Sequence, residues 1–342
     1  MYCVKELVES RGCLQSVPSN YVFPENHDDC IISEEEPIPT IDYSLLTSGS
    51  LEQRSKVIHK LGNACREWGF FTVINHEVPK TLRDEMIKAT EKFFDLSEED
   101  KREYAGKKLF DPIRWGTSFN VKVDKTFFWR DYLKVHVHPQ FNAPKNPPGF
   151  SEVQEEYCKK NRELASELLK GISASLGLEE SYLQKTLNVG SNSHQLLVIN
   201  LYPPCPQPEV VMGLPPHSDH GLLTVLMQNG PGGLQVQHNG KWVPVNLPPD
   251  SFVVNVGDQM EIFSNGMYKS VVHRAVVNGK ATRISIGTGN GPPLDTVVSP
   301  APELLDRENR HAGYRGITYK QYMELQQSNR LDGKSCLTHV RI

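Results

Sequence analysis

The 342-residue sequence lacks features that would place it in several common classes of protein. It has no long uninterrupted apolar stretch, and residues 1–10 lack the apolar segment of a signal peptide, so we expect neither a membrane-spanning helix nor a signal peptide. The net charge is −4, and without a basic excess nothing indicates nucleic acid or an anionic membrane as a partner.

Cysteine is too sparse and irregular for a disulfide framework. The seven cysteines form no Cys-x-x-Cys pair, and their number is odd. They are Cys3, Cys13, Cys30, Cys65, Cys158, Cys205 and Cys336. This pattern is typical of a reducing compartment, so we expect a cytoplasmic protein.

A first chemical signal lies in Leu214–His220, which resembles the start of a strand. His217 and Asp219 are two positions apart. Successive strand side chains point to opposite faces, so these two project together and could bind one ion. Alternatively they form a polar pair in a turn, because so short a motif also occurs by chance.

His273, in the β-branched run Val271–Val277, is the candidate for a third ligand. Two histidines and one carboxylate make the facial triad of non-heme Fe(II) oxygenases, which leaves positions open for chemistry. The alternative is a hydrogen-bonded core histidine, which is the more frequent role of a single histidine in an apolar strand.

Two further pairs have the same two-residue spacing. Arg283 and Ser285 place a cation beside a hydroxyl, and Asn200 and Tyr202 end the apolar run 195–199. A guanidinium group offers a planar fork of donors that matches a carboxylate. These pairs suit a dicarboxylate bound beside the metal, although Arg283 and Ser285 could also form a solvated strand face.

Together these segments resemble the plant-type 2-oxoglutarate- and Fe(II)-dependent dioxygenases. The resemblance covers nearly the whole chain and runs through 68–76, 200–209, 217–219, 254–258, 273–274 and 283–285. It implies three iron ligands, namely His217, Asp219 and His273. It implies that the distal carboxylate of 2-oxoglutarate is held by Arg283, Ser285 and Tyr202. Asn200 either joins this anchor or braces the strand ends.

The resemblance also implies Fe(II), the co-substrate 2-oxoglutarate, O₂ and ascorbate as an activator, with release of succinate and CO₂. We expect a monomer that hydroxylates a small, largely apolar plant metabolite such as a flavonoid, coumarin, hormone or alkaloid. O-demethylation and desaturation are alternatives within the family, as is its ascorbate-using oxidase branch. A jelly roll that binds metal or ligand without turnover is the alternative outside enzymes.

The predicted fold is mainly β with a helical N-terminal part, and the resemblance implies a double-stranded β-helix (jelly roll) core backed by helices. Apolar residues recur at helical spacing in 51–68, 79–94 and 153–176. Short β-rich runs separated by turn residues follow from 195 to 288. We expect a polar arm rather than a packed element at 1–37, an N-terminal region at 38–150, a linking helix at 151–192, the core at 193–295, and a C-terminal segment at 296–342 with a helix at 319–327.

The loop at Asn278 and Gly279 provides an internal check. If these two residues closed a tight hairpin, His273 would face away from Arg283. We therefore expect a longer loop, or a bulge with Gly279 at positive φ.

The substrate side of the site is predicted less sharply. The resemblance places substrate contacts at Phe119, Val121 and Phe128. Gly289 stands where many relatives carry an aromatic residue, which predicts a wider cavity unless Gly289 has positive φ in a turn. Glu77 stands where relatives usually have glycine, so the turn there is absent or built differently.

Overall fold

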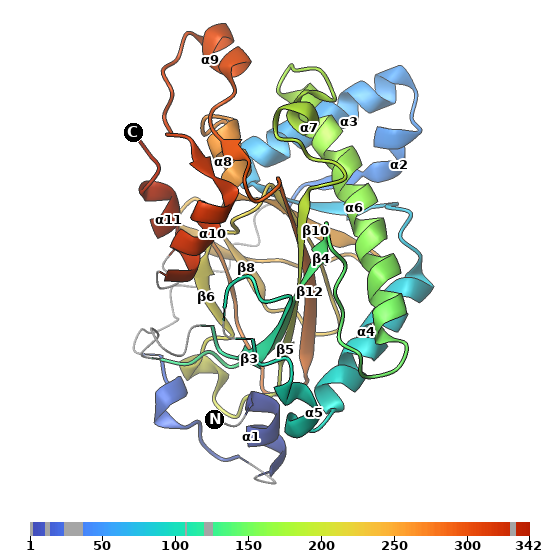
Figure 1. Cartoon of the computed structure of the whole chain (residues 1–342), viewed down its shortest axis with the longest axis vertical. Coiled ribbons are helices and arrows are strands. Elements are labelled where there is room, and N and C mark those ends of the chain that lie inside the picture. The colour runs from blue at the N-terminus through green and yellow to red at the C-terminus, as the bar shows by residue number, and fades with distance from the viewer. Residues whose placement is uncertain (1–2, 11–13, 24–36, 107, 120–125, 329–332) are drawn as a thin grey trace.

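Two β-sheets face each other across a cavity in the computed structural model, and helices cover the outer side of the larger sheet (Figure 1). The structure describes residues 3–10, 14–23, 37–106, 108–119, 126–328 and 333–342. Val121, one of the predicted substrate contacts, lies outside the described residues. This arrangement is the predicted jelly roll.

The larger sheet has eight strands in the order β1-β2-β10-β7-β12-β5-β4-β3, and all its neighbours except β1 and β2 are antiparallel. The smaller has the order β6-β11-β8-β9, and β13 pairs with β14. The strands are β1 Thr40–Asp42, β2 Phe70–Ile74, β3 Ile113–Thr117, β4 Asp131–His138, β5 His194–Tyr202, β6 Leu214–His217, β7 Leu223–Gln228, β8 Leu234–His238, β9 Lys241–Pro244, β10 Phe252–Val256, β11 His273–Ala275, β12 Arg283–Gly291, β13 Val297–Val298 and β14 Ile317–Thr318.

Helices α3, α4 and α6 pack together, and apolar side chains of α6 such as Leu168 and Ile172 share one core with Val225 and Ile286 of the large sheet. The helices are α1 Val4–Ser10, α2 Tyr43–Thr47, α3 Leu51–Asn63, α4 Lys80–Asp95, α5 Glu98–Arg102, α6 Phe150–Ser175, α7 Tyr182–Thr186, α8 Asp258–Phe263, α9 Pro302–Glu308, α10 Tyr319–Ser328 and α11 Ser335–Thr338. Among the described residues, no helix is long and apolar enough to cross a membrane.

Several helix boundaries have identifiable chemical causes. Ser97 caps α5 by accepting a hydrogen bond from the backbone N–H of Asp100 at 3.1 Å. The first long helix ends in a π-turn at Ala64–Trp68, and Gly69 follows with a φ of 62°. Gly177 has a φ of 73° just beyond α6, a conformation that glycine adopts without steric cost.

The N-terminal residues pack more closely than a polar arm would. The backbone N–H groups of Val4 and Lys5 donate to the buried carboxylate of Asp131, each at 2.8 Å. Tyr21 is buried and makes an edge-on contact with Trp129. The expectation of an unpacked arm is therefore wrong for residues 3–10 and 14–23.

The expectation of a hairpin between the strands of His273 and Arg283 is also wrong. Strand β11 belongs to the smaller sheet and β12 to the larger one, so the connection crosses between sheets. Asn278 shapes it, because its side-chain oxygen accepts hydrogen bonds from the N–H groups of Lys280 and Ala281. Gly279 does not have positive φ. His273 and Arg283 share one cavity because the sheets face each other, so no special hairpin phase is required.

The C-terminal segment is fastened to the loop that follows β6. Asp258 of α8 accepts hydrogen bonds from Tyr322 of α10 at 2.7 Å and from Ser218 at 3.1 Å. Gln326 donates to the carbonyl oxygen of Ser218 at 3.1 Å. Nearby, the buried Glu261 accepts from Lys334, Arg341, Tyr314 and the N–H of Ser270. Helix α10 thus covers one side of the cavity, and it corresponds to the helix predicted at 319–327.

Candidate active site

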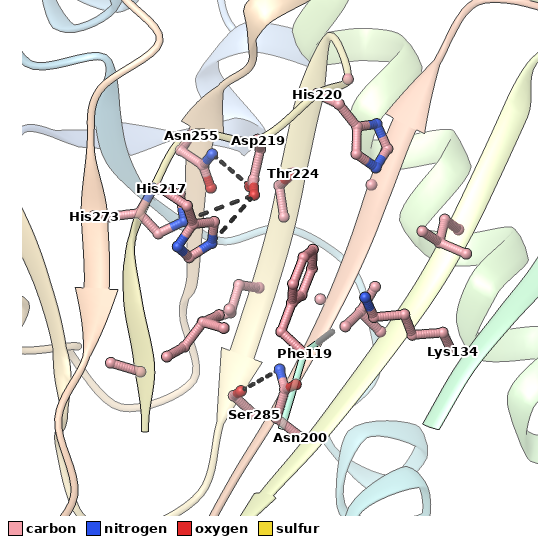
Figure 2. Close-up of a pocket in the computed structure, with 18 of the residues that line it drawn as sticks. Phe119, Lys134, Asn200, His217, Asp219, His220, Thr224, Asn255, His273 and Ser285 are labelled. Atoms are coloured by element: carbon pink, nitrogen blue, oxygen red, sulfur yellow. Dashed lines mark hydrogen bonds and ion pairs between the residues drawn. The ribbon is translucent and has the colours of Figure 1, made fainter. Parts of the chain in front are cut away.

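A cavity between the two sheets brings together most of the predicted site residues. Figure 2 shows His217, Asp219 and His273 at one end, Asn200 and Ser285 at the lower edge, and Lys134 on the opposite side. The strands place them there because inward-facing residues alternate along each strand. The described lining also includes many apolar side chains, among them Phe70, Leu109, Phe119, Leu196, Val198 and Leu226.

His217, Asp219 and His273 form a compact cluster whose ligand atoms all lie within 4.8 Å of one another. The Nε2 atoms of His217 and His273 are 3.8 Å and 3.7 Å from Oδ1 of Asp219. Ligand atoms at right angles and about 2.1 Å from one ion are about 3 Å apart, so a small inward rotation of the side chains brings all three onto a single ion. The pairing of β6 with β11, with His217 opposite His273, creates this arrangement.

Both imidazoles are oriented by the backbone two residues upstream. Nδ1 of His217 lies 2.8 Å from the carbonyl oxygen of Pro215, and Nδ1 of His273 lies 3.1 Å from that of Val271. A proton on each Nδ1 leaves Nε2 free to bind a metal, which is the usual arrangement around a metal-binding histidine. Burial and the neighbouring His273 lower the pKa of His217 to about 3, which favours the neutral, metal-binding form.

Asp219 is held as a carboxylate. Burial alone would raise its pKa, but His273, His217 and hydrogen bonds from Thr224 and Asn255 together lower it below the ordinary value. Nδ2 of Asn255 donates to Oδ2 of Asp219 at 2.9 Å, which leaves Oδ1 facing the imidazoles. Asn255 is a supporting residue to which the sequence analysis gave no role.

Arg283 lies deep in the large sheet with a guanidinium nitrogen to spare. Its Nε and Nη2 donate to Oε1 of Gln228 at 3.1 and 2.7 Å. Its Nη1 is buried and has no hydrogen-bond partner among the described residues. Tyr202 lies opposite Arg283 on β5, with the guanidinium carbon 4.9 Å from its ring centroid. An unpaired buried donor is costly, so this nitrogen is suited to a carboxylate.

Asn200 and Ser285 form the second cross-strand pair of this wall. Nδ2 of Asn200 donates to Oγ of Ser285 at 3.3 Å, while its Oδ1 accepts from Nη1 of Arg130 at 2.7 Å. The pairing of β5 with β12 thus brings the two predicted pairs side by side, with Arg283 opposite Tyr202 and Ser285 opposite Asn200. The Asn200 contacts favour a bracing role beside the anchor.

Only some of the predicted substrate contacts line the cavity. Phe119 lines the cavity, whereas Phe128 is absent from the described lining and packs against Phe23 instead. Gly289 lines the cavity from extended strand backbone, which excludes the positive-φ alternative. A Cβ there would meet only the carbonyl oxygen of Leu196, at 3.8 Å. Glu77 has a φ of 61°, so the turn usually made by glycine is retained with a non-glycine residue.

Strands β3 and β4 were not predicted, although the sequence contained a signal for β4. Residues 131–138 alternate strictly between buried and partly exposed side chains. Arg114 and Lys134 of these strands also line the cavity. The alternation of Leu133, Val135 and Val137 with charged or polar residues would have identified them.

These features define a class of protein. A two-histidine, one-carboxylate cluster with open space beside it suits Fe(II), and a buried guanidinium group with a free donor suits the far carboxylate of a 2-oxo acid. The residues present therefore fit both Fe(II) and 2-oxoglutarate. The site is that of a mononuclear non-heme Fe(II) oxygenase on a jelly roll.

Comparisons with known proteins agree with this class. Residues 193–289 match the 2OG-Fe(II) oxygenase superfamily, and residues 38–157 match the non-haem dioxygenase in morphine synthesis N-terminal family. The chain is 48% identical over 306 residues to 2-oxoglutarate-dependent dioxygenase 19 of Oryza sativa subsp. japonica, covering 89% of this chain and 90% of that one. It is 37% identical to oxoglutarate-dependent flavonoid 7-O-demethylase 1 of Ocimum basilicum, covering 99% and 90%.

A crystal structure of JOX2 in complex with 2OG, Fe and JA is also similar, with a TM-score of 0.88 and 32% identity over 100% of this chain and 98% of that one. The chain belongs to the plant-type 2-oxoglutarate- and Fe(II)-dependent oxygenase family. It is a dioxygenase that uses Fe(II) and 2-oxoglutarate.

Proposed function

We propose that this dioxygenase hydroxylates a small, largely apolar plant metabolite at an Fe(II) ion bound by His217, Asp219 and His273. The observation that carries the proposal is the compact cluster of these three side chains beside an open, mostly apolar cavity. Arg283, Ser285 and Tyr202 hold the distal carboxylate of 2-oxoglutarate. Bound together, Fe(II), 2-oxoglutarate and O₂ supply the oxidising chemistry and release succinate and CO₂, with ascorbate as an activator.

The protein contributes position and charge. Asn255 and the two backbone carbonyl oxygens fix the ligand side chains before a metal arrives, so little order is lost on binding. Arg283 neutralises one carboxylate of the co-substrate, and Gln228 fixes the plane of its guanidinium group. The apolar lining keeps bulk water from the reacting end.

Succinate release is the decisive assay. Purified protein with Fe(II), 2-oxoglutarate and O₂ should release succinate, and a jelly roll that only binds ligand would not. Replacing 2-oxoglutarate with ascorbate and bicarbonate tests the oxidase branch, which does not consume 2-oxoglutarate. Turnover under those conditions alone would contradict the proposal.

Hydroxylation is proposed over O-demethylation and desaturation, although a relative at 37% identity is named as a flavonoid O-demethylase. Mass spectrometry of a plant metabolite extract incubated with the complete enzyme distinguishes the three reactions. A gain of one oxygen atom indicates hydroxylation, loss of a methyl group indicates demethylation, and loss of two hydrogens indicates desaturation.

The open space at Gly289 favours a ring-bearing substrate. Phenylalanine at this position should block the substrate found in the extract while 2-oxoglutarate decarboxylation without substrate persists. The control is Gly289→Ala, because a single methyl group has room there. Equal loss of both activities in the two variants would instead indicate a damaged strand.

We further propose that the chain is a cytoplasmic monomer whose partner is its small-molecule substrate, with no nucleic acid or membrane partner. The described cysteines are all buried and form no disulfide bond with one another, which suits a reducing compartment. Light scattering on a sizing column tests the oligomeric state. Localisation of a tagged full chain tests the compartment.

A further inference from the structure

The cavity wall opposite the metal cluster carries two basic side chains that face the same space. Arg114 of β3 and Lys134 of β4 are direct cross-strand partners, so they project from one face of the sheet. Like charges in this position repel each other, and here the pair is largely shielded from water, with Arg114 only 7% exposed. Such an arrangement is unfavourable unless something negative lies beside it.

Among the described residues Lys134 has no carboxylate beside it, and the only carboxylate that influences Arg114 is Asp111, which lies outside the cavity lining. Within the part of the chain that the structure describes, the Lys134 ammonium group makes no hydrogen bond or ion pair and lies 4.9 Å from the Phe119 ring centroid. Nε of Arg114 is buried without a hydrogen-bond partner. Burial, Arg114 and Arg130 lower the pKa of Lys134 well below its ordinary value. Burial also lowers the pKa of Arg114, an effect opposed by Tyr132 and Asp111.

The charges of the site also fail to balance at this wall. The described lining contains one carboxylate, Asp219, and five basic side chains, which are Arg114, Arg130, Lys134, Arg274 and Arg283. Fe(II) with Asp219 and doubly charged 2-oxoglutarate with Arg283 would sum to zero. Arg274 stacks on Trp242, and Arg130 donates to Asn200. Within the described lining, Arg114 and Lys134 are left without a carboxylate of their own.

We propose that the substrate of this dioxygenase carries a carboxylate on an apolar, ring-bearing body, and that Arg114 and Lys134 bind that carboxylate. The inference rests on the function proposed above and names the substrate class. An arriving anion would favour the charged form of Lys134 and offer an acceptor to Nε of Arg114. Phe119, beside the ammonium group, supplies an aromatic face for the body of the substrate.

The sheet register orients that body. The row that begins at Lys134 continues through Val198 and Gly287 to Leu226, and these residues all line the cavity. Because Gly287 has no side chain, nothing projects into the cavity from its position in the middle of this row. Three strand spacings of about 4.8 Å separate Lys134 from Leu226, roughly 14 Å along the sheet. Thr224, two residues before Leu226 on β7, hydrogen-bonds the metal ligand Asp219, so the metal lies towards the Leu226 end of the row. The oxidised carbon therefore lies at the end of the molecule remote from the carboxylate.

A matched pair of probes tests the inference without turnover. 2-Naphthoate and 2-naphthamide share one ring system and differ in charge. Calorimetric titration of each into protein loaded with Mn(II) and 2-oxoglutarate under nitrogen should show the acid binding at least about tenfold more tightly, the value of one charge-assisted hydrogen bond. Equal binding of the two probes to the wild-type protein would overturn the inference, and this result does not depend on any variant folding.

Variants then locate the charge. Lys134→Met and Arg114→Gln should each reduce the preference for the acid to about twofold or less, a loss of roughly one charge-assisted contact. Lys134→Arg should retain it. The control is Lys56→Met, because Lys56 is exposed on α3 and pairs with Glu52. An unchanged preference in both charge-removing variants contradicts the assignment, as does loss of 2-oxoglutarate affinity in Lys134→Met.

Succinate release by the wild-type protein, measured without any probe, separates this inference from the proposed function. Succinate release together with equal binding of the probes overturns the carboxylate site alone. Preference for the acid without succinate release supports the cationic wall and overturns the assignment as a working oxygenase.

Discussion

The two ends of the cavity use polar side chains in opposite ways. At the metal end, Nδ1 of His217 and Nδ1 of His273 each have a backbone partner, and Asn255 holds the outer oxygen of Asp219. At the cationic end, the Lys134 ammonium group contacts only aromatic rings, and neither it nor Nε of Arg114 has a hydrogen-bond partner among the described residues. The side chains at the metal end are oriented before the metal binds. The charge at the cationic end is balanced only when an anionic ligand binds.

The difference indicates what each end recognises. Ligands of a small ion must be placed within a fraction of an ångström, so hydrogen bonds from the protein orient the ligand side chains. An organic anion brings its own acceptors, so donors that would satisfy it must be left free. Arg283 combines both strategies, because Gln228 fixes its plane while Nη1 remains available.

The largest effect should follow removal of a ligand from the metal end. Asp219→Ala should abolish bound iron and succinate release, because two imidazoles cannot hold Fe(II) in the facial geometry. His217→Ala and His273→Ala should do the same. Metal analysis of the purified protein measures the first effect, with Asp84→Ala on the exposed face of α4 as a control. Near-normal iron in any of the three variants would remove that residue from the ligand set.

Arg283→Ala should produce the next largest effect. Charge-assisted hydrogen bonds are each worth about 1.5 to 3 kcal/mol, so the affinity for 2-oxoglutarate should fall about 10- to 150-fold. Arg283→Lys should recover only part of this, since lysine lacks the planar fork. Titration of 2-oxoglutarate into the Mn(II)-loaded protein measures the change. Unaltered affinity in the alanine variant would show that the co-substrate binds elsewhere.

A smaller effect should follow loss of a supporting hydrogen bond. Asn255→Ala keeps all three ligands but frees the outer oxygen of Asp219, so metal affinity should fall about tenfold, the lower range for such supporting residues. Competition with a fluorescent chelator measures it. Unchanged metal affinity would mean that the hydrogen bond from Asn255 does not help Asp219 to bind the metal.

The smallest effect concerns backbone strain at Glu77, which lies outside both ends of the cavity. Glu77 is exposed with a φ of 61°. A non-glycine residue held there costs about 1 to 3 kcal/mol, partly offset by the greater chain entropy of glycine, so Glu77→Gly should stabilise the fold by about 1 kcal/mol. Urea denaturation measures the gain. Glu77→Ala retains the strain and should show none, and an equal gain in that variant would attribute the effect to charge.

Local sequence patterns predicted the parts of the fold that depend on neighbouring residues. The helices at 51–68 and 153–176 and the pairs on β5 and β12 all follow from the spacing of residues along the chain. The facing of two sheets does not follow from spacing, and so the connection at Asn278 was taken for a hairpin. The burial of Val4 against Asp131 also depends on contacts more than 120 positions apart.

The site itself divides in the same way. The metal cluster and the anchor were predicted because most of their residues form pairs two positions apart in strand-like segments, and because those segments together resemble one family. Lys134 and Arg114 were missed, because a basic residue in an alternating strand normally faces solvent, and only the opposing sheet turns that face into a cavity wall.

Helix α10 binds the loop after β6, so the site is completed only after the C-terminal part of the chain has been made. Gln326 donates to the carbonyl oxygen of Ser218, 108 positions earlier in the chain. At synthesis rates of about 5 to 20 residues per second, the metal-binding loop waits roughly 5 to 20 seconds for this contact. His273 is made 53 positions before Gln326, so a nascent chain carries all three ligand side chains roughly 3 to 11 seconds before the loop at Ser218 is clamped. Iron acquired in that interval would be held less firmly than iron acquired after α10 has docked.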